Sequence, residues 1–252
     1  MHVCLEHEAT SIDTRKSHMK PIVIVVAIFI AVSAFGTPVC APDTAADYIK
    51  AGSCTEDPFI LKDFAWSSVS GGNFVKVTPD QVFLTPASTG QFGLNFQGVP
   101  GKPNPFDISG SHEIFAQFDY TIDPRPPILN GMSLSMNASS PSGGGSATIT
   151  ATICAGSTFK DSCAGGTFLP PITVQDFGDG DPRNVLFINI PFPAAVNVVD
   201  IRMTLDMKAN GGISEITGGG TVASMVPEPG SAAFVMSGFA ALLGLAYRRS
   251  HN

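Results

Sequence analysis

The chain has 252 residues, of which 44% are apolar and 14% charged, with a formal net charge of −7. Residues 42–226 hold nine Lys and Arg against 17 Asp and Glu, a net charge of −8. An acidic body without a basic cluster repels phosphates, which argues against nucleic-acid binding. The 26 glycines and 20 prolines stay below the range of disordered low-complexity chains. The composition therefore favours a folded protein of short strands and turns.

The N-terminal region is typical of an export signal. Residues 21–35 form an uncharged apolar segment directly after Lys20. The segment is short for a membrane-spanning helix and has the length of a signal-peptide core. Small residues at its end favour cleavage by signal peptidase before Thr37. Residues 1–18 carry a net charge of −1, unlike the start of a signal peptide, so we expect Met19 to be the true start and residues 19–36 to be the signal.

The body, residues 37–225, is predicted to be all-β. Apolar and polar residues alternate with a period of two in residues 114–122, 146–154 and 199–207. Weaker strand patterns lie in residues 59–65, 74–78, 82–85, 92–96, 132–137, 167–174, 185–190 and 213–226. One buried and one polar face, repeated over about ten strands, favours an antiparallel β-sandwich or jelly roll. Only residues 44–51 are expected to be helical, which excludes a parallel α/β fold because no crossover helices exist.

Three segments rich in glycine, proline or serine interrupt these patterns. Residues 99–105 contain three prolines and are expected to form a long loop. Residues 139–146 are rich in serine and glycine, and because strands flank them we expect a hairpin connection. The glycine run at residues 218–220 is expected to loosen the approach to the C-terminal segment.

Four of the five cysteines follow the export signal: Cys40, Cys54, Cys154 and Cys163. In an oxidising compartment an even number of cysteines indicates disulfides. Of the three connectivities, we expect the two local pairs, Cys40–Cys54 and Cys154–Cys163. A zinc site is the alternative, but gaps of 13 and eight intervening residues fit the close spacing of zinc ligands poorly.

Asp176, Asp179 and Asp181, interspersed with two glycines, form a candidate calcium site. Calcium takes several oxygen ligands from a tightly turning chain. The cluster lacks the full EF-hand pattern and its distant glutamate, and aspartate and glycine also dominate ordinary turns. A plain turn is therefore expected, with calcium as the alternative and no other cofactor.

The body contains few residues that could carry catalysis. Its single histidine, His112, is not accompanied by a Gly-x-Ser-x-Gly elbow, so we expect a turn histidine and not a triad member. Glu113, Asp119 and Asp123 could serve a glycosidase only if two carboxylates faced each other about 5–10 Å apart. Solvated charges on a strand face are the expected reading of these carboxylates. We therefore expect a protein without enzymatic activity.

The C-terminal segment carries the most specific pattern. Val226-Pro227-Glu228-Pro229 precedes an uncharged apolar stretch, residues 231–247, which Arg248 and Arg249 follow. A helix over this stretch would span roughly 26 Å at about 1.5 Å per residue, the short end of what a bilayer needs. The arginines would hold its end in the cytoplasm. The alternative is an ordinary anchor after a proline-rich linker.

These parts, in this order, resemble a PEP-CTERM sorting signal covering residues 226–252. The resemblance implies a bacterial exported protein whose tail is recognised by exosortase, an integral-membrane cysteine protease, and cut near the motif. Exosortase, signal peptidase and the membrane are thus the implied partners. Residues 46–54 and 61–66 also resemble the opening of many PEP-CTERM exported proteins.

We therefore expect an exported β-sandwich with a structural or adhesive role. Its precursor would be anchored in the inner membrane with a periplasmic body, before it reaches the cell surface or an extracellular polysaccharide matrix. A carbohydrate-binding module and, less favoured, a secreted hydrolase are the alternatives. Trp66 and Phe64 could line a sugar platform, but with 18 phenylalanines in the chain a core position is favoured.

Overall fold

The computed structural model describes residues 37–225 except 57, 88–91, 125–128, 140 and 179. The predicted signal peptide and Asp179 lie outside the described residues. So do Val226, Pro227, Glu228 and Pro229, the apolar stretch 231–247, and Arg248 and Arg249. Among the described residues, no helix is long and apolar enough to cross a membrane.

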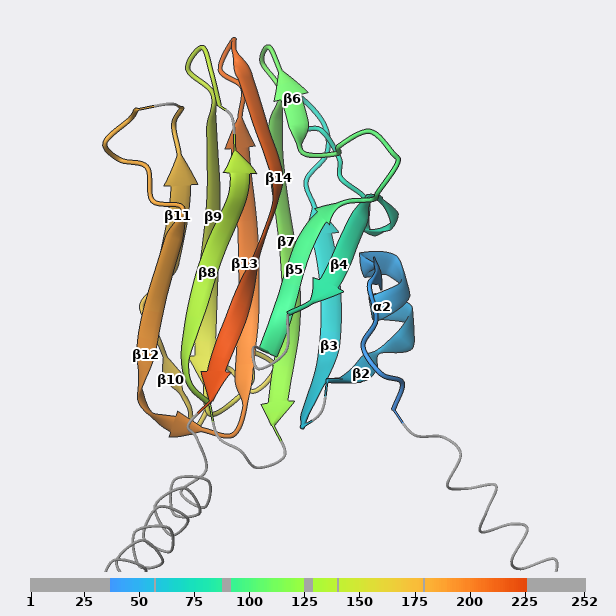
Figure 1. Ribbon diagram of the computed structural model, residues 1–252, viewed down its shortest axis with the longest axis vertical. Helices are drawn as coiled ribbons and strands as arrows, with labels where there is room; N and C mark the ends of the chain where they lie inside the picture. Colours follow the sequence, from blue (N-terminus) through green and yellow to red (C-terminus); the bar gives the residue numbers. More distant parts are fainter. Residues whose placement is uncertain are drawn as a thin grey trace, which may run out of the picture. The chain divides into compact units, whose positions relative to one another are not determined.

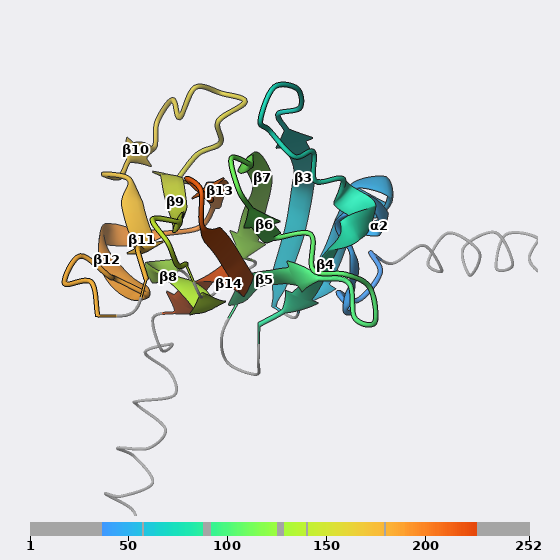
Figure 2. The same ribbon diagram turned by 90° about the horizontal axis from the view of Figure 1, so that it is seen from above.

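The body is a sandwich of two antiparallel sheets, which confirms the predicted all-β class (Figures 1 and 2). Sheet A contains, in spatial order, β10 (Thr167–Phe168), β9 (Ser146–Ala155), β13 (Val199–Lys208), β7 (Glu113–Pro124), β3 (Phe59–Ser68) and β2 (Ser53–Glu56), with β11 (Ile172–Asp176) also paired to β9. Sheet B contains β1 (Asp43–Thr44), β4 (Val82–Pro86), β5 (Phe92–Gly98), β14 (Ile213–Met225), β8 (Leu129–Ser139) and β12 (Phe187–Val196), with β6 (Asp107–Ser109) paired to β14. Figure 1 looks onto sheet B, with sheet A behind it.

A short helix, α2 (Ala45–Ala51), and a 3₁₀ turn, η1 (Pro79–Gln81), accompany the sheets. The helix begins where expected because the Thr44 hydroxyl caps it by accepting the backbone N–H of Asp47. It ends at Gly52, whose φ of 75° suits glycine. The helix lies beside β3 and β4 (Figure 1) and buries Tyr48 against the core.

The three strongest alternating patterns form the neighbouring strands β7, β13 and β9 at the centre of sheet A. Their apolar faces are buried, as a period of two predicts. Two of the weaker predictions are wrong. Residues 74–78 make only isolated bridges, and residues 167–174 split into β10 and β11 because Pro170 and Pro171 supply no backbone N–H.

Two predictions about connections are also wrong. Residues 139–146 do not form a hairpin, because β8 belongs to sheet B and β9 to sheet A. The segment instead pairs with the start of β14, where Ser142 and Ile213 exchange backbone hydrogen bonds of 2.9 and 3.0 Å. The chain therefore crosses between the layers here, and the expected long loop at residues 99–105 connects β5 to β6.

The glycine run at residues 218–220 lies within β14, a central strand paired with β5 on one side and β8 on the other. The prediction of a loosening linker is therefore wrong. A Cβ at Gly218 would lie 2.2 Å from the Phe96 carbonyl oxygen, and one at Gly219 would lie 2.5 Å from Ile149 Cδ1. The glycines are required because the neighbouring strand and the opposite sheet approach β14 too closely for a side chain.

Tyr120 tethers the two sheets inside the core. It belongs to β7 of sheet A, and its fully buried hydroxyl accepts the backbone N–H of Leu94 in sheet B at 3.3 Å. The hydroxyl also hydrogen-bonds to the Thr221 side chain on β14. Burial raises the pKa of Tyr120 above its ordinary value, so it stays a neutral donor and acceptor.

Trp66 and Phe64 pack into the same core, as expected, and form no exposed platform. Phe64 is buried, and Trp66 lies half-buried against the core with its ring centroid 6.3 Å from that of Phe118. The indole Nε1–H donates to the carbonyl oxygen of Val77 at 3.0 Å, which satisfies its polar atom.

Candidate functional site

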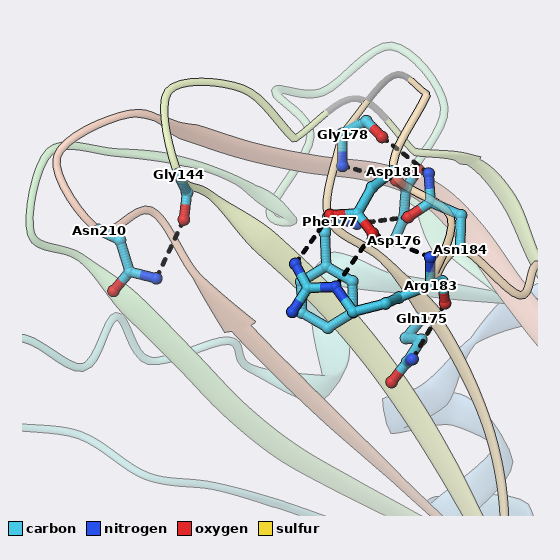
Figure 3. A network of polar contacts seen from close by, with 9 residues as sticks. All are labelled: Gly144, Gln175, Asp176, Phe177, Gly178, Asp181, Arg183, Asn184 and Asn210. Atoms are coloured by element: carbon cyan, nitrogen blue, oxygen red, sulfur yellow. Dashed lines mark hydrogen bonds and ion pairs between the residues drawn. The ribbon is translucent and has the colours of Figure 1, made fainter.

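The acidic loop with the candidate calcium ligands is a turn, as expected, and its described carboxylates bind to the protein itself (Figure 3). Asp176, at the end of β11, is only 5% exposed. Its Oδ1 accepts the backbone N–H of Gly178 at 2.8 Å, and its Oδ2 accepts the Ser139 hydroxyl. The buried carboxylate therefore joins β11 to β8.

Asp181 is held by Arg183. The carboxylate accepts hydrogen bonds from the backbone N, Nε and Nη2 of Arg183 at 2.9, 3.0 and 2.7 Å. These bonds lower the pKa of Asp181 to about 2. The guanidinium also lies 4.0 Å from the centroid of the Phe177 ring, and Asn184 closes the turn through Phe177 N–H and Gly178 carbonyl contacts. Within the described residues no group of three metal-binding side chains is assembled.

Both predicted disulfides are present. Cys40–Cys54 ties the segment before α2 to β2, with Cα atoms 4.9 Å apart. Cys154–Cys163, with Cα atoms 5.8 Å apart, closes the loop after β9. Because the sulfurs are bonded to one another, the zinc alternative is wrong.

The outer face of sheet A carries charged side chains that form ion pairs with one another. Arg202 contacts Asp119 at 3.1 Å, and Lys62 contacts Asp123 at 2.5 Å. Asp119 and Asp123 are therefore engaged by cations and not by each other. His112 lies exposed in the turn before β7, where its Nδ1 is 2.9 Å from the Ser109 carbonyl oxygen, as expected for a turn histidine.

The loop closed by Cys154–Cys163 is anchored across this charged face, which the sequence did not reveal. Asp200 is 6% exposed and accepts the Phe159 backbone N–H at 2.7 Å and the Thr121 hydroxyl at 3.2 Å. Burial raises the pKa of this carboxyl. Lys160 of the loop pairs with Asp63, which has a φ of 60° at a bulge in β3. The loop thus fixes the exposed Phe168, whose ring stacks on Phe159 at 6.0 Å.

The outer face of sheet B has the opposite character. Strands β4, β5, β8 and β12 and residues 216–225 of β14 contain no Asp, Glu, Lys or Arg. The side chains on this outer face are mostly amides and hydroxyls. We call the following set the amide face: Asn95 and Gln97 on β5, Ser133, Ser135 and Asn137 on β8, and Asn189 on β12.

Strand register places these side chains in rows across the sheet. Gln97 and Asn137 stand opposite one another on either side of Gly218. One row further along β14, residues Asn95 and Ser135 flank Gly220 in the same way. Gly218 and Gly220 have no side chains and are themselves buried, and Asn95 Oδ1 lies over Gly220, so β14 lies below the polar side chains of β5 and β8. We call these two residues the glycine floor.

The amide side chains are not occupied by the protein. Within the described part of the chain, the carboxamides of Asn95, Gln97, Asn137 and Asn189 make no hydrogen bond to another protein group. Gln97, Asn137 and Asn189 are exposed, and Asn95 is half-buried because its Oδ1 lies over Gly220. Each amide therefore has both donor and acceptor capacity for a ligand.

A hollow of about 360 Å³ opens at one end of the glycine floor. Gln97 belongs both to the amide face and to the wall of this hollow. The other polar lining residues are Lys102, Asn104, Glu215 and Thr217. Asn104 Nδ2 donates to the Ile216 carbonyl at 2.8 Å, which holds the proline-rich loop against β14.

No family model and no curated protein matches the chain. Among solved structures, the enzymatically active domain of tailspike protein 4 from bacteriophage CBA120 is similar over 65% of this chain and 19% of that chain, with 12% identity and a TM-score of 0.31. The module TmCBM61, solved in complex with β-1,4-galactotriose, is similar over 66% of this chain and 89% of that chain, with 9% identity and a TM-score of 0.28. The chain thus spans about a fifth of the tailspike domain. At these TM-scores neither likeness carries weight for function.

Proposed function

We propose that the chain is an exported, non-enzymatic β-sandwich protein that is sorted to the cell surface or extracellular matrix through its C-terminal signal. The two disulfides support export, because such bonds form and persist in oxidising compartments outside the cytoplasm. The resemblance of residues 226–252 to a PEP-CTERM signal supports the route. Signal peptidase would remove the N-terminal segment, and exosortase would process the tail.

In this proposal Glu228, between two prolines, is the residue that exosortase recognises. Proline disfavours helical geometry in the residue before it, so the Pro227-Glu228-Pro229 triplet would be extended where a protease can bind it. The apolar stretch 231–247 would hold the triplet at the membrane, with Arg248 and Arg249 on the cytoplasmic side. Cleavage would then release or re-anchor the body.

The proposed role of the body is adhesive or structural. The observation that carries this proposal is the uncharged amide face, which offers unpaired polar groups to an extracellular partner. A hydrolase is not proposed, because the candidate carboxylates Asp119 and Asp123 are engaged by Arg202 and Lys62.

Replacement of the sorting triplet tests the route. With Pro227, Glu228 and Pro229 all changed to alanine, we expect the precursor to stay in the membrane fraction of the native host. The matched control changes Pro100, Pro103 and Pro105 of the body loop to alanine and should leave processing intact. Fractionation with mass spectrometry of the mature termini measures both outcomes, and unchanged release of the triplet variant would contradict exosortase sorting.

A further inference from the structure

We propose that the amide face binds a neutral polysaccharide, with the sugar chain lying along β14 over the glycine floor and reaching the hollow beside Gln97. This inference deepens the proposed function and rests on it for the extracellular setting. The binding itself is a property of the folded body.

The net negative charge of the body favours a neutral ligand over an acidic one. Residues 42–226 carry a net charge of −8, which repels uronic-acid and phosphate-bearing polymers at long range. The strands of the amide face carry no cation that could offset this repulsion locally. Lys102 lies in the hollow together with Glu215, so the hollow has no excess positive charge.

Hydrogen-bonding capacity selects a ligand rich in hydroxyl groups. The carboxamides of Asn95, Gln97 and Asn137 each offer two N–H donors and one carbonyl acceptor, and the described residues use none of these groups. A sugar hydroxyl both donates and accepts, so one such amide can bind two neighbouring hydroxyls. On sheet A and in the loop anchored across it, by contrast, Lys62, Asp63, Asp119, Asp123, Lys160 and Arg202 are engaged in ion pairs with one another.

The glycine floor indicates that a bound sugar chain would lie along β14. Adjacent strands are about 4.8 Å apart, so Gln97 and Asn137 stand about 10 Å apart across Gly218. That width accommodates one polymer chain between these two side chains. Thr217 and Glu215, which precede the glycine floor along β14, line the hollow together with Gln97.

Aromatic residues flank the rows at the two sides of the sheet. Phe187 on β12 lies opposite Ser135 and is 63% exposed, and Phe83 on β4 lies opposite Gln97 and is half-buried. An exposed aromatic ring offers an apolar surface for the C–H face of a sugar ring. The centre of the face lacks the large apolar core that protein–protein interfaces have, which disfavours a second copy or another protein as the occupant.

Calorimetric titration of the full-length protein in detergent tests the proposal. The probes are neutral hexasaccharides of β-1,4-linked glucose, galactose and xylose, with a hexamer of galacturonic acid as the acidic probe. We expect at least one neutral hexasaccharide to bind with a Kd below 1 mM, which corresponds to roughly −4 kcal/mol, and the acidic hexamer to bind at least tenfold more weakly.

The variant Gln97→Ala with Asn137→Ala removes one amide from each side of the glycine floor, and we expect it to weaken binding of the neutral probe at least tenfold. Both side chains are exposed, so thermal unfolding should be unchanged. Thr204→Ala, at an outward position of sheet A, is the matched control and should bind like the parent.

Three results would overturn the proposal. The first is that the parent binds no neutral hexasaccharide. The second is that the double variant binds the neutral probe as tightly as the parent does, and the third is that the parent binds the acidic hexamer more tightly than the neutral ones. Light scattering measures the oligomeric state of both proteins. If the parent is a dimer and the double variant is a monomer, the occupant of the face is a second copy of the chain and not a sugar. Unchanged release of the triplet variant would contradict the sorting proposal but would leave this binding untouched, so the two proposals fail separately.

Discussion

Replacing Glu56 by glutamine should stabilise the protein at alkaline pH. Glu56 ends β2, and its half-buried carboxyl accepts the backbone N–H of Gly93 in sheet B. Its Oε2 atom is buried and has no hydrogen-bond partner among the described residues. Burial raises the pKa of Glu56 from 4.5 to about 7.

The sign and size of the effect follow from proton linkage. A raised carboxyl pKa means that the folded state binds the proton more tightly than the unfolded state. The associated stability is present below pH 4.5 and is lost as the pH rises through 7. A rise of this size in the pKa corresponds to about 3 kcal/mol in the free energy of unfolding if it is fully expressed. Because Glu56 is only half-buried, solvent screening reduces the expected change in this free energy to about 1.5 kcal/mol.

Thermal unfolding of the parent and of Glu56→Gln between pH 4 and pH 8.5 measures this pH dependence of stability. The glutamine mimics the protonated carboxyl, so we expect equal stability near pH 4 and a gain of roughly 3–6 °C in Tm at pH 8.5. Glu113→Gln, at the start of β7, controls for the loss of one negative charge. A gain that is independent of pH, or a loss at pH 8.5, would refute the reasoning.

Two further changes probe the core and the loop over sheet A. Tyr120→Phe leaves the Leu94 N–H and a threonine hydroxyl unpaired in the core, so we expect a loss of about 1–3 kcal/mol in urea unfolding with an unchanged slope; a neutral effect would show that the tether is not needed. Replacing Cys154 and Cys163 by serine opens a ring of about ten residues and should lower the free energy of unfolding by about 2–3 kcal/mol. Unfolding midpoints with and without reductant check this, since reductant should weaken the parent more than this variant.

Much of the fold follows from local patterns. The alternation in β7, β9 and β13 predicts both the strands and their buried faces, because a strand with one solvated side repeats every two residues. The partners of each strand are not local. Residues 139–146 look like a hairpin in sequence, yet they join strands of different sheets, since the buried faces of β8 and β9 pack toward the same core.

The candidate site was harder to predict for the same reason. The sequence shows directly that β4, β5, β8, β12 and most of β14 contain no charged residue. An uncharged surface forms only when the topology brings these five segments, from residue 82 to residue 225, into one sheet. The glycine run misled the prediction because glycine is common in linkers, whereas here it marks close approach between paired strands.

The edge strand β12 limits how this protein can assemble. Pro191 and Pro193 lie in β12, the last strand of sheet B, and proline has no N–H to donate. A further strand could therefore not continue the hydrogen-bond ladder along this stretch. An edge strand without charged side chains would otherwise be prone to edge-to-edge pairing during folding. The prolines therefore protect this edge of the sheet against pairing with another strand.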